Sequence, residues 1–284
     1  MLQALTSSRG RVRAKRHLDL KWGNIILTDF VSAIGRATIS MVRHAGALAI
    51  FAGGGLSGLL RRPFYWRVFL TNFFEIAYYS LPVVALTAIF SGGVIALQSY
   101  TGFAQYHAQG AIGGIVVLAV TRELGPVLAG LMVAGRVGAA MAAEIGTMRV
   151  TDQIDALKTL AVEPMRYLVT PRLLAATLAL PLLVLIGDVL GVLGGFVVSV
   201  YKLGFDPASY VVTTLNVVTA LDVWVGLAKA AVFGFLIALL GCYHGYSSRG
   251  GAEGVGAATT AAVVGASILL LAFDYLLTDL FFDQ

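Results

Sequence analysis

Residues 121–172 read TRELGPVLAGLMVAGRVGAAMAAEIGTMRVTDQIDALKTLAVEPMRYLVTPR, and this stretch decides the fold class. Its first part continues a long apolar run that begins at residue 112 and ends at residue 143. Such a run exceeds the ~20 apolar residues that cross a bilayer as a helix. Its second part, residues 144–172, is polar and contains several Lys and Arg residues. A spanning helix followed by a basic loop predicts an all-α integral membrane protein.

The composition of the whole chain supports this class. The 284 residues are 58% hydrophobic and only 12% charged, whereas about 25% of the residues of a soluble domain are charged. A chain this apolar cannot cover its surface with polar groups, so most of it must face lipid. Cys242 is the single cysteine, which excludes an intrachain disulfide and a multi-cysteine metal site.

Five apolar stretches are long enough to be transmembrane helices. They are residues 81–103, 112–143, 173–201, 223–246 and 257–281. The loops between them alternate between basic loops and loops with few or no Lys and Arg, and basic loops mark the cytoplasmic side. This alternation predicts a cytoplasmic N-terminus and a periplasmic C-terminus.

The second span is longer than one crossing requires. Its 32 residues would form a helix of ~48 Å, against a hydrocarbon core of ~30 Å. The helix must therefore tilt, bend or project into the cytoplasm. We expect a hinge at Gly125 and Pro126, because proline removes one backbone hydrogen bond and clashes with the preceding turn.

The first 80 residues differ from the five-span permease domain predicted at 81–284. Residues 1–24 are expected to be a flexible basic tail, since six of the 20 Lys and Arg lie in the first 22 residues. The tail is interpreted as a positive-inside signal. A binding arm for anionic lipid or nucleic acid is the alternative.

Residues 25–80 are expected to form interfacial, amphipathic helices. Arg36 and Arg43 are seven residues apart and share a helix face, which is typical of a helix lying in the interface. The stretch 45–60 is apolar but short, so both a re-entrant and an interfacial placement stay open. Aromatic residues in the stretch 63–79 favour a second interfacial segment.

The basic loop contains a predicted amphipathic helix at about residues 147–161. Its apolar stripe consists of Val150, Ile154, Leu157 and Ala161. Pro164 is expected to end it. Such a helix can dock on a soluble partner. The alternatives are that it lies on the membrane surface or packs on its own bundle.

Ionisable residues inside the spans need partners, because a charge at the bilayer centre costs at least ~2.5 kcal/mol. The candidates are Arg122, Glu123, Asp188, Lys229 and Asp274. Their depths along the helices favour a Lys229–Asp274 pair and make Asp188 the candidate partner of Arg122. These charges either line a lipid-headgroup cavity, with the Arg122 guanidinium binding phosphate, or form structural pairs that hold the bundle.

Residues 121–172 resemble the signature of the MlaE/YrbE family, the permeases of MCE-linked lipid ABC transporters. The matching segments are Arg122–Pro126, Ala134–Arg136, Ala143–Gly146, Met148–Leu157 and Val162–Pro164. The resemblance extends from about residue 25 to the C-terminus. Asp152 stands where members often carry Glu, which keeps the charge.

The resemblance implies a permease with an interfacial N-terminal helix and five spans, working as a homodimer in the bacterial inner membrane. A plastid envelope is the alternative location. The implied cargo is phospholipid or a related lipid. The implied partners are a second copy of the chain, a cytoplasmic ABC ATPase, an MCE-domain periplasmic lipid-binding protein and a small STAS-domain protein. The helix at 147–161 would then be the coupling helix seated on the ATPase. Its candidate contact residues are Met148, Arg149, Val150, Asp152, Ile154, Asp155, Leu157 and Lys158.

The sequence holds no catalytic motif. It contains no GxxxxGK[ST] phosphate loop, HExxH, GxSxG or CxxC. We therefore expect no enzymatic activity, cofactor or metal in this chain, and expect ATP and Mg²⁺ to be bound by the partner ATPase. The alternative function is a stand-alone channel or ion-coupled transporter that uses the intramembrane charges as a relay.

Overall fold

The structure is a computed structural model that describes residues 32, 35–36, 38–59, 65–103 and 109–282. The predicted basic tail at 1–24 lies outside these residues. The chain divides into two units, Met1–Gly53 and Gly54–Gln284. The described part of the first unit belongs largely to a helix, Thr38–Leu59, which continues into the second unit.

The described residues of the second unit are mostly helical. Its α-helices are α2 (Trp66–Phe103), α3 (Ile112–Ala119), α4 (Gly125–Val133), α5 (Ala139–Val150), α6 (Gln153–Thr159), α7 (Thr170–Tyr201), α8 (Pro207–Val217), α9 (Ala220–Tyr246) and α10 (Gly251–Phe282). A short 3₁₀ turn, η2 (Gln109–Ala111), precedes α3. Three π-helical turns are η3 (Val120–Leu124), η4 (Ala134–Gly138) and η5 (Met165–Val169).

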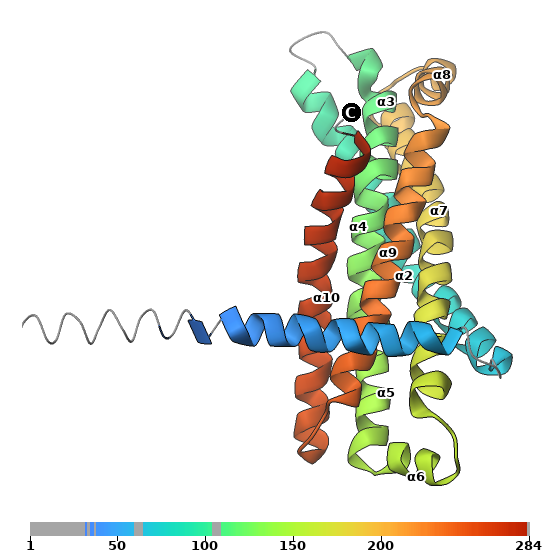
Figure 1. The fold of residues 1–284 in the computed structure, drawn as a ribbon. Helices are drawn as coiled ribbons and strands as arrows, with labels where there is room; N and C mark the ends of the chain where they lie inside the picture. The colour runs from blue at the N-terminus through green and yellow to red at the C-terminus, as the bar shows by residue number, and fades with distance from the viewer. Residues whose placement is uncertain (1–31, 33–34, 37, 60–64, 104–108, 283–284) are drawn as a thin grey trace, which may run out of the picture. The chain divides into compact units, whose positions relative to one another are not determined.

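Long helices run side by side in this unit, with α6 at one end and α8 at the other (Figure 1). α7 packs against α2 and α9, and α9 also packs against α5 and α10. Six described helices are long and apolar enough to cross a membrane, and α9 is the most buried of them. The predicted all-α integral membrane fold is confirmed.

The N-terminal boundary of the first predicted span is wrong. Residues 66–80, expected to be part of a separate interfacial segment, form one continuous helix with residues 81–103. Pro82 lies inside α2 without ending it, since α7 and α4 pack along the helix. Residues 45–59, for which a re-entrant placement was open, belong to the continuous helix Thr38–Leu59.

The second span contains two π-helical turns and is longer than predicted. It runs from Ile112 to Val150. The first π-helical turn, η3, directly precedes Gly125 and Pro126, so the backbone departs from α-helical geometry at the predicted hinge. At this turn the Gly125 N–H donates to the Val120 carbonyl oxygen, five residues earlier.

Close backbone contact joins α2 to α7. A Cβ atom on Gly92 would overlap the Gly191 carbonyl oxygen, and one on Gly194 would overlap the Ile89 carbonyl oxygen. Small residues are what allow membrane helices to approach this closely. Gly92 and Gly191 therefore pack α2 on α7 within one chain.

We expect Gly92→Ala to destabilise the protein by about 1–3 kcal/mol or more, because backbone atoms, unlike a flexible side chain, cannot move aside. Gly102→Ala is the matched control, since Gly102 lies in the same helix with nothing within 4 Å of its Cβ position. Thermal unfolding in detergent would compare the two. Equal melting temperatures for the two variants would contradict the close contact.

Candidate functional site

A network of charged side chains lies inside the bundle, centred on Lys229 of α9. The side chain of Lys229 is 0% exposed. Its Nζ lies 3.1 Å from Glu123 Oε1 of η3 and 3.0 Å from Asp274 Oδ1 of α10. It also donates to Thr278 Oγ1 at 2.7 Å. The predicted Lys229–Asp274 pair is confirmed, and Glu123 joins it as a second carboxylate.

Lys229 also bonds to the irregular backbone at the hinge. Pro126 has no N–H, so the Arg122 carbonyl loses its ordinary donor four residues later. Lys229 Nζ donates to this carbonyl oxygen at 3.0 Å. Gly226, one turn earlier in α9, allows the approach, because a Cβ atom there would lie 2.5 Å from the Thr121 carbonyl oxygen. Lys229 thus binds the carboxylates of Glu123 and Asp274 as well as the backbone of η3.

Arg122 pairs with Asp222, which sequence reasoning missed. Arg122 Nη2 and Nε each lie 2.7 Å from Asp222 Oδ1. Asp222 is in the first turn of α9, where it forms a capping box with Thr219. The signal that could have located it is the spacing Thr-x-x-Asp before an apolar run, which marks a helix N-terminus.

The predicted Arg122–Asp188 pair is wrong. Asp188 lies in α7 and is buried, and its Oδ1 has no hydrogen-bond partner among the residues that the structure describes. This oxygen contacts the hinge instead, since a Cβ atom on Gly125 would overlap it. Depth matching placed the two residues at similar levels but gave no information about which face of each helix they occupy.

Exposure divides the network into an inner and an outer part. The side chains of Lys229 and Asp222 are fully buried, and that of Asp274 is 17% exposed. Arg122 and Glu123 keep 36% and 40% of their side-chain surface exposed. The inner part therefore fastens the helices together, while the guanidinium of Arg122 and the carboxylate of Glu123 can reach a ligand.

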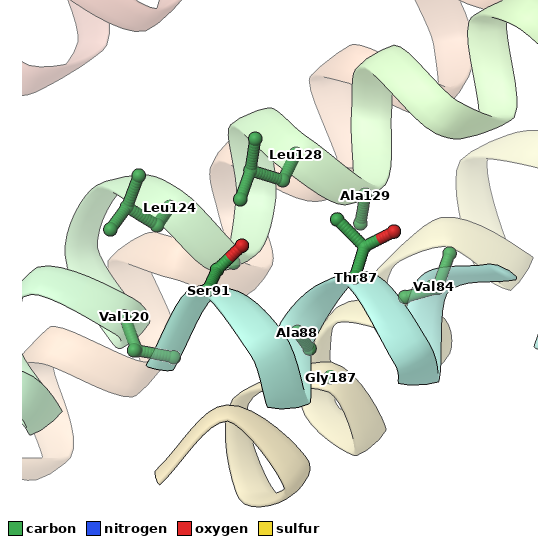
Figure 2. Close-up of a pocket in the computed structure, with 10 residues that line it drawn as sticks. Val84, Thr87, Ala88, Ser91, Val120, Leu124, Leu128, Ala129 and Gly187 are labelled. Carbon is green, nitrogen blue, oxygen red and sulfur yellow. The ribbon is translucent and has the colours of Figure 1, made fainter. Parts of the chain in front are cut away.

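A small cavity borders the hinge (Figure 2). It lies between α2, η3, α4 and α7, and its lining includes Thr87, Ser91, Leu124, Gly125 and Gly187. Its volume of about 20 Å³ holds roughly one water molecule. The cavity is therefore far too small for a lipid.

The loop between α5 and α7 forms a compact turn at the opposite end of the bundle from α8 (Figure 1). Asp155 binds Arg149 Nη1 at 3.1 Å and Lys158 Nζ at 2.7 Å. The hydrogen bond from Lys158 lowers the pKa of Asp155 and raises the pKa of Lys158. The Arg149 guanidinium also lies over the ring of Tyr246, at the end of α9.

The helix predicted at 147–161 is shorter in the structure. Residues 147–150 end α5, and Asp152 has a left-handed backbone conformation that separates them from α6. Ala161 is also left-handed and follows the end of α6. The predicted apolar stripe therefore does not lie on one helix. Of the candidate contact residues, Met148, Arg149 and Val150 belong to α5.

Burial within the loop changes which apolar residue is available to a partner. Ile154 is fully buried in its own chain, as α6 packs on α5. Leu157 is half-buried. Leu160, which sequence reasoning did not select, is 72% exposed at the tip of the loop. Ile154 therefore packs within its own chain, which agrees with the alternative that this helix packs on its own bundle.

The fold and the site define a multi-pass helical membrane protein whose spans enclose a network of charged side chains. The chain belongs to the MlaE permease family, because the family described as "Permease MlaE" matches residues 69–280. This family is one of ABC transporter permeases, so the resemblance seen in residues 121–172 is confirmed.

Individual relatives agree with the family. The chain is 52% identical over 257 residues to a "Probable ABC transporter permease protein" of Rickettsia bellii, with 90% of this chain and 99% of the relative covered. It is 32% identical over 258 residues to the "Intermembrane phospholipid transport system permease protein MlaE" of Haemophilus influenzae, with 90% and 99% covered. It is 35% identical over 237 residues to "Protein TRIGALACTOSYLDIACYLGLYCEROL 1, chloroplastic" of Arabidopsis thaliana, with 84% and 68% covered.

Proposed function

We propose that this chain is the membrane permease of an ABC transporter that moves phospholipids between membranes. The similarity to a permease named for intermembrane phospholipid transport, over 90% of this chain, is the observation that carries the proposal. A separate cytoplasmic ATPase supplies the energy, and the loop that contains α6 transmits it. The chain itself acts as a transport subunit and not as an enzyme.

Within this function, Arg122 and Glu123 contact the lipid headgroup. Their partial exposure supports this role. A guanidinium binds phosphate through two parallel hydrogen bonds. Lys229 and Asp274 hold η3 in place, because Lys229 is fully buried and already has five oxygen partners on η3 and α10, one of which is the Arg122 carbonyl oxygen.

The proposed assembly contains two copies of this chain, the ATPase, an MCE-domain periplasmic protein and a STAS-domain protein. It lies in the bacterial inner membrane. The N-terminus is cytoplasmic and the C-terminus periplasmic, as the distribution of basic loops indicates. The loop with α6 then faces the cytoplasm, where the ATPase is.

The headgroup role is tested by removing the guanidinium without leaving a buried charge. We expect the double variant Arg122→Gln with Asp222→Asn to fold and to lower ATP-dependent phospholipid transfer about tenfold, as loss of a charge-assisted hydrogen bond predicts. The amides can still pair across η3 and α9. Transfer would be measured between labelled and acceptor liposomes with the reconstituted complex.

Asp222→Asn alone is the matched control, since it keeps the guanidinium. Transfer by the double variant at the wild-type rate would contradict the headgroup role. Ion flux without ATP and without a partner would contradict the ABC function and favour the stand-alone ion-coupled transporter.

A further inference from the structure

Asp188 is the one charge candidate that the network around Lys229 does not include. It lies near the middle of α7, and only 6% of its surface is exposed. Its Oδ1 is buried, and no group in the described part of the chain forms a hydrogen bond with it. An ionised carboxylate at this depth without a partner is costly, and such a group is ordinarily neutralised by taking up a proton.

Among the described residues, no ion pair or hydrogen bond joins Asp188 to a charged group. Besides Asp188, the Arg, Lys, His, Asp and Glu residues on α7 and on the elements packed against it are Arg67, Glu75, Arg122, Glu123, Arg166, Arg172, Asp222, Lys229 and His244. The other titratable groups there are Cys242 and the tyrosines Tyr78, Tyr79, Tyr100, Tyr167, Tyr201, Tyr210, Tyr243 and Tyr246. Those nearest the hinge are already engaged: Arg122 binds Asp222, and Lys229 binds Glu123 and Asp274. A counter-charge for an ionised Asp188 is therefore not provided by this network.

The surroundings of Asp188 Oδ1 consist of backbone at the π-helical turn. The Cβ position of Gly125 overlaps Asp188 Oδ1 and lies 2.9 Å from the Val120 carbonyl oxygen. Two oxygens thus flank the same glycine. The Val120 oxygen accepts from the Gly125 N–H, and a carbonyl oxygen has a second lone pair. A proton on the Asp188 carboxyl would turn this group from an acceptor into a donor beside the carbonyl oxygen.

We propose that Asp188 is a neutral carboxylic acid that donates a hydrogen bond to the Val120 carbonyl oxygen and thereby positions η3. Lys229 binds the same turn through the Arg122 carbonyl oxygen. The turn that presents Arg122 and Glu123 is then held by α7 through Asp188 and by α9 through Lys229. Asp188 is a positioning residue in this arrangement and does not touch the lipid.

Infrared spectroscopy tests the protonation state directly. The difference spectrum between wild type and Asp188→Asn at neutral pH is expected to contain the carbonyl stretch of a protonated carboxylic acid. A difference spectrum that shows carboxylate bands instead would overturn the proposal. This measurement needs only the purified chain, so it stands whether or not the proposed transport function is correct.

Transport tests the positioning role, and this arm rests on the proposed function. Asp188→Asn keeps a neutral donor, so ATP-dependent lipid transfer should stay within about twofold of wild type, whereas Asp188→Leu, which lacks a donor, should lower it about tenfold. Gly125→Ala should resemble Asp188→Leu, because its methyl group displaces the carboxyl. Melting temperatures identify any variant that fails to fold. Loss of transfer in Asp188→Asn, or full transfer in a folded Asp188→Leu, would overturn the role.

Discussion

Lys229→Met is expected to destabilise the protein by about 3–5 kcal/mol, the usual cost of removing one partner from a buried ion pair. Asp274 and Glu123 would be left as neighbouring carboxylates of like charge, and the Arg122 carbonyl would lose its donor. Asp274 is the more buried of the two carboxylates and should account for most of the loss. Thermal unfolding in detergent and the amount of protein in the membrane would both report it.

Removing the opposing charges at the same time should recover the stability. We expect the triple variant Lys229→Met, Glu123→Gln and Asp274→Asn to melt close to wild type, because replacing a whole buried charge network is often nearly neutral. Lys202→Met is the control, as Lys202 is an exposed lysine beyond the end of α7. A single Lys229→Met variant that melts with the wild type would show that the network does not hold the helices.

Helix depth predicted part of the network correctly. Lys229 and Asp274 lie at similar distances from the ends of helices that are consecutive in the chain, and consecutive spans with a short loop are neighbours. The same reasoning failed for Arg122, because its distance from the helix end does not give its rotation about the axis. The π-helical turn at 120–124 changes that rotation locally, and a sequence pattern does not reveal it.

The five spans predicted from apolar length, which needs no knowledge of packing, all correspond to helices in the structure. Thr38–Leu59, expected to lie in the interface, is a sixth helix that is long and apolar enough to cross a membrane. The helix in the basic loop was harder to predict. A periodic stripe predicted one helix through residues 147–161, but the left-handed backbone at Asp152 and Ala161 divides this segment. Neither position is glycine, so the usual sequence signal for such a turn is missing.

Leu160→Asp is expected to abolish co-purification of the ATPase while leaving the permease folded. Leu160 is highly exposed at the tip of the loop that contains α6, so a charge there disturbs no contact within the chain. In the proposed complex, Leu160 would insert into an apolar pocket of the ATPase. Truncating such an anchor costs about 2 kcal/mol or more of binding free energy. A buried carboxylate costs more still. Affinity purification of the tagged permease from cells that contain the ATPase would measure the loss.

Two further aspartate variants distinguish docking from folding. Val212→Asp places the same charge at an exposed apolar position of α8, at the opposite end of the bundle from α6 (Figure 1), and should retain the ATPase. Ile154→Asp should lose the ATPase only together with the fold, because Ile154 is buried in its own chain. If Leu160→Asp retains the ATPase fully, the loop tip is not the contact. If it loses the ATPase while its melting temperature stays at the wild-type value, the exposed leucine transmits the coupling, and the stripe predicted through Ile154 serves the fold instead.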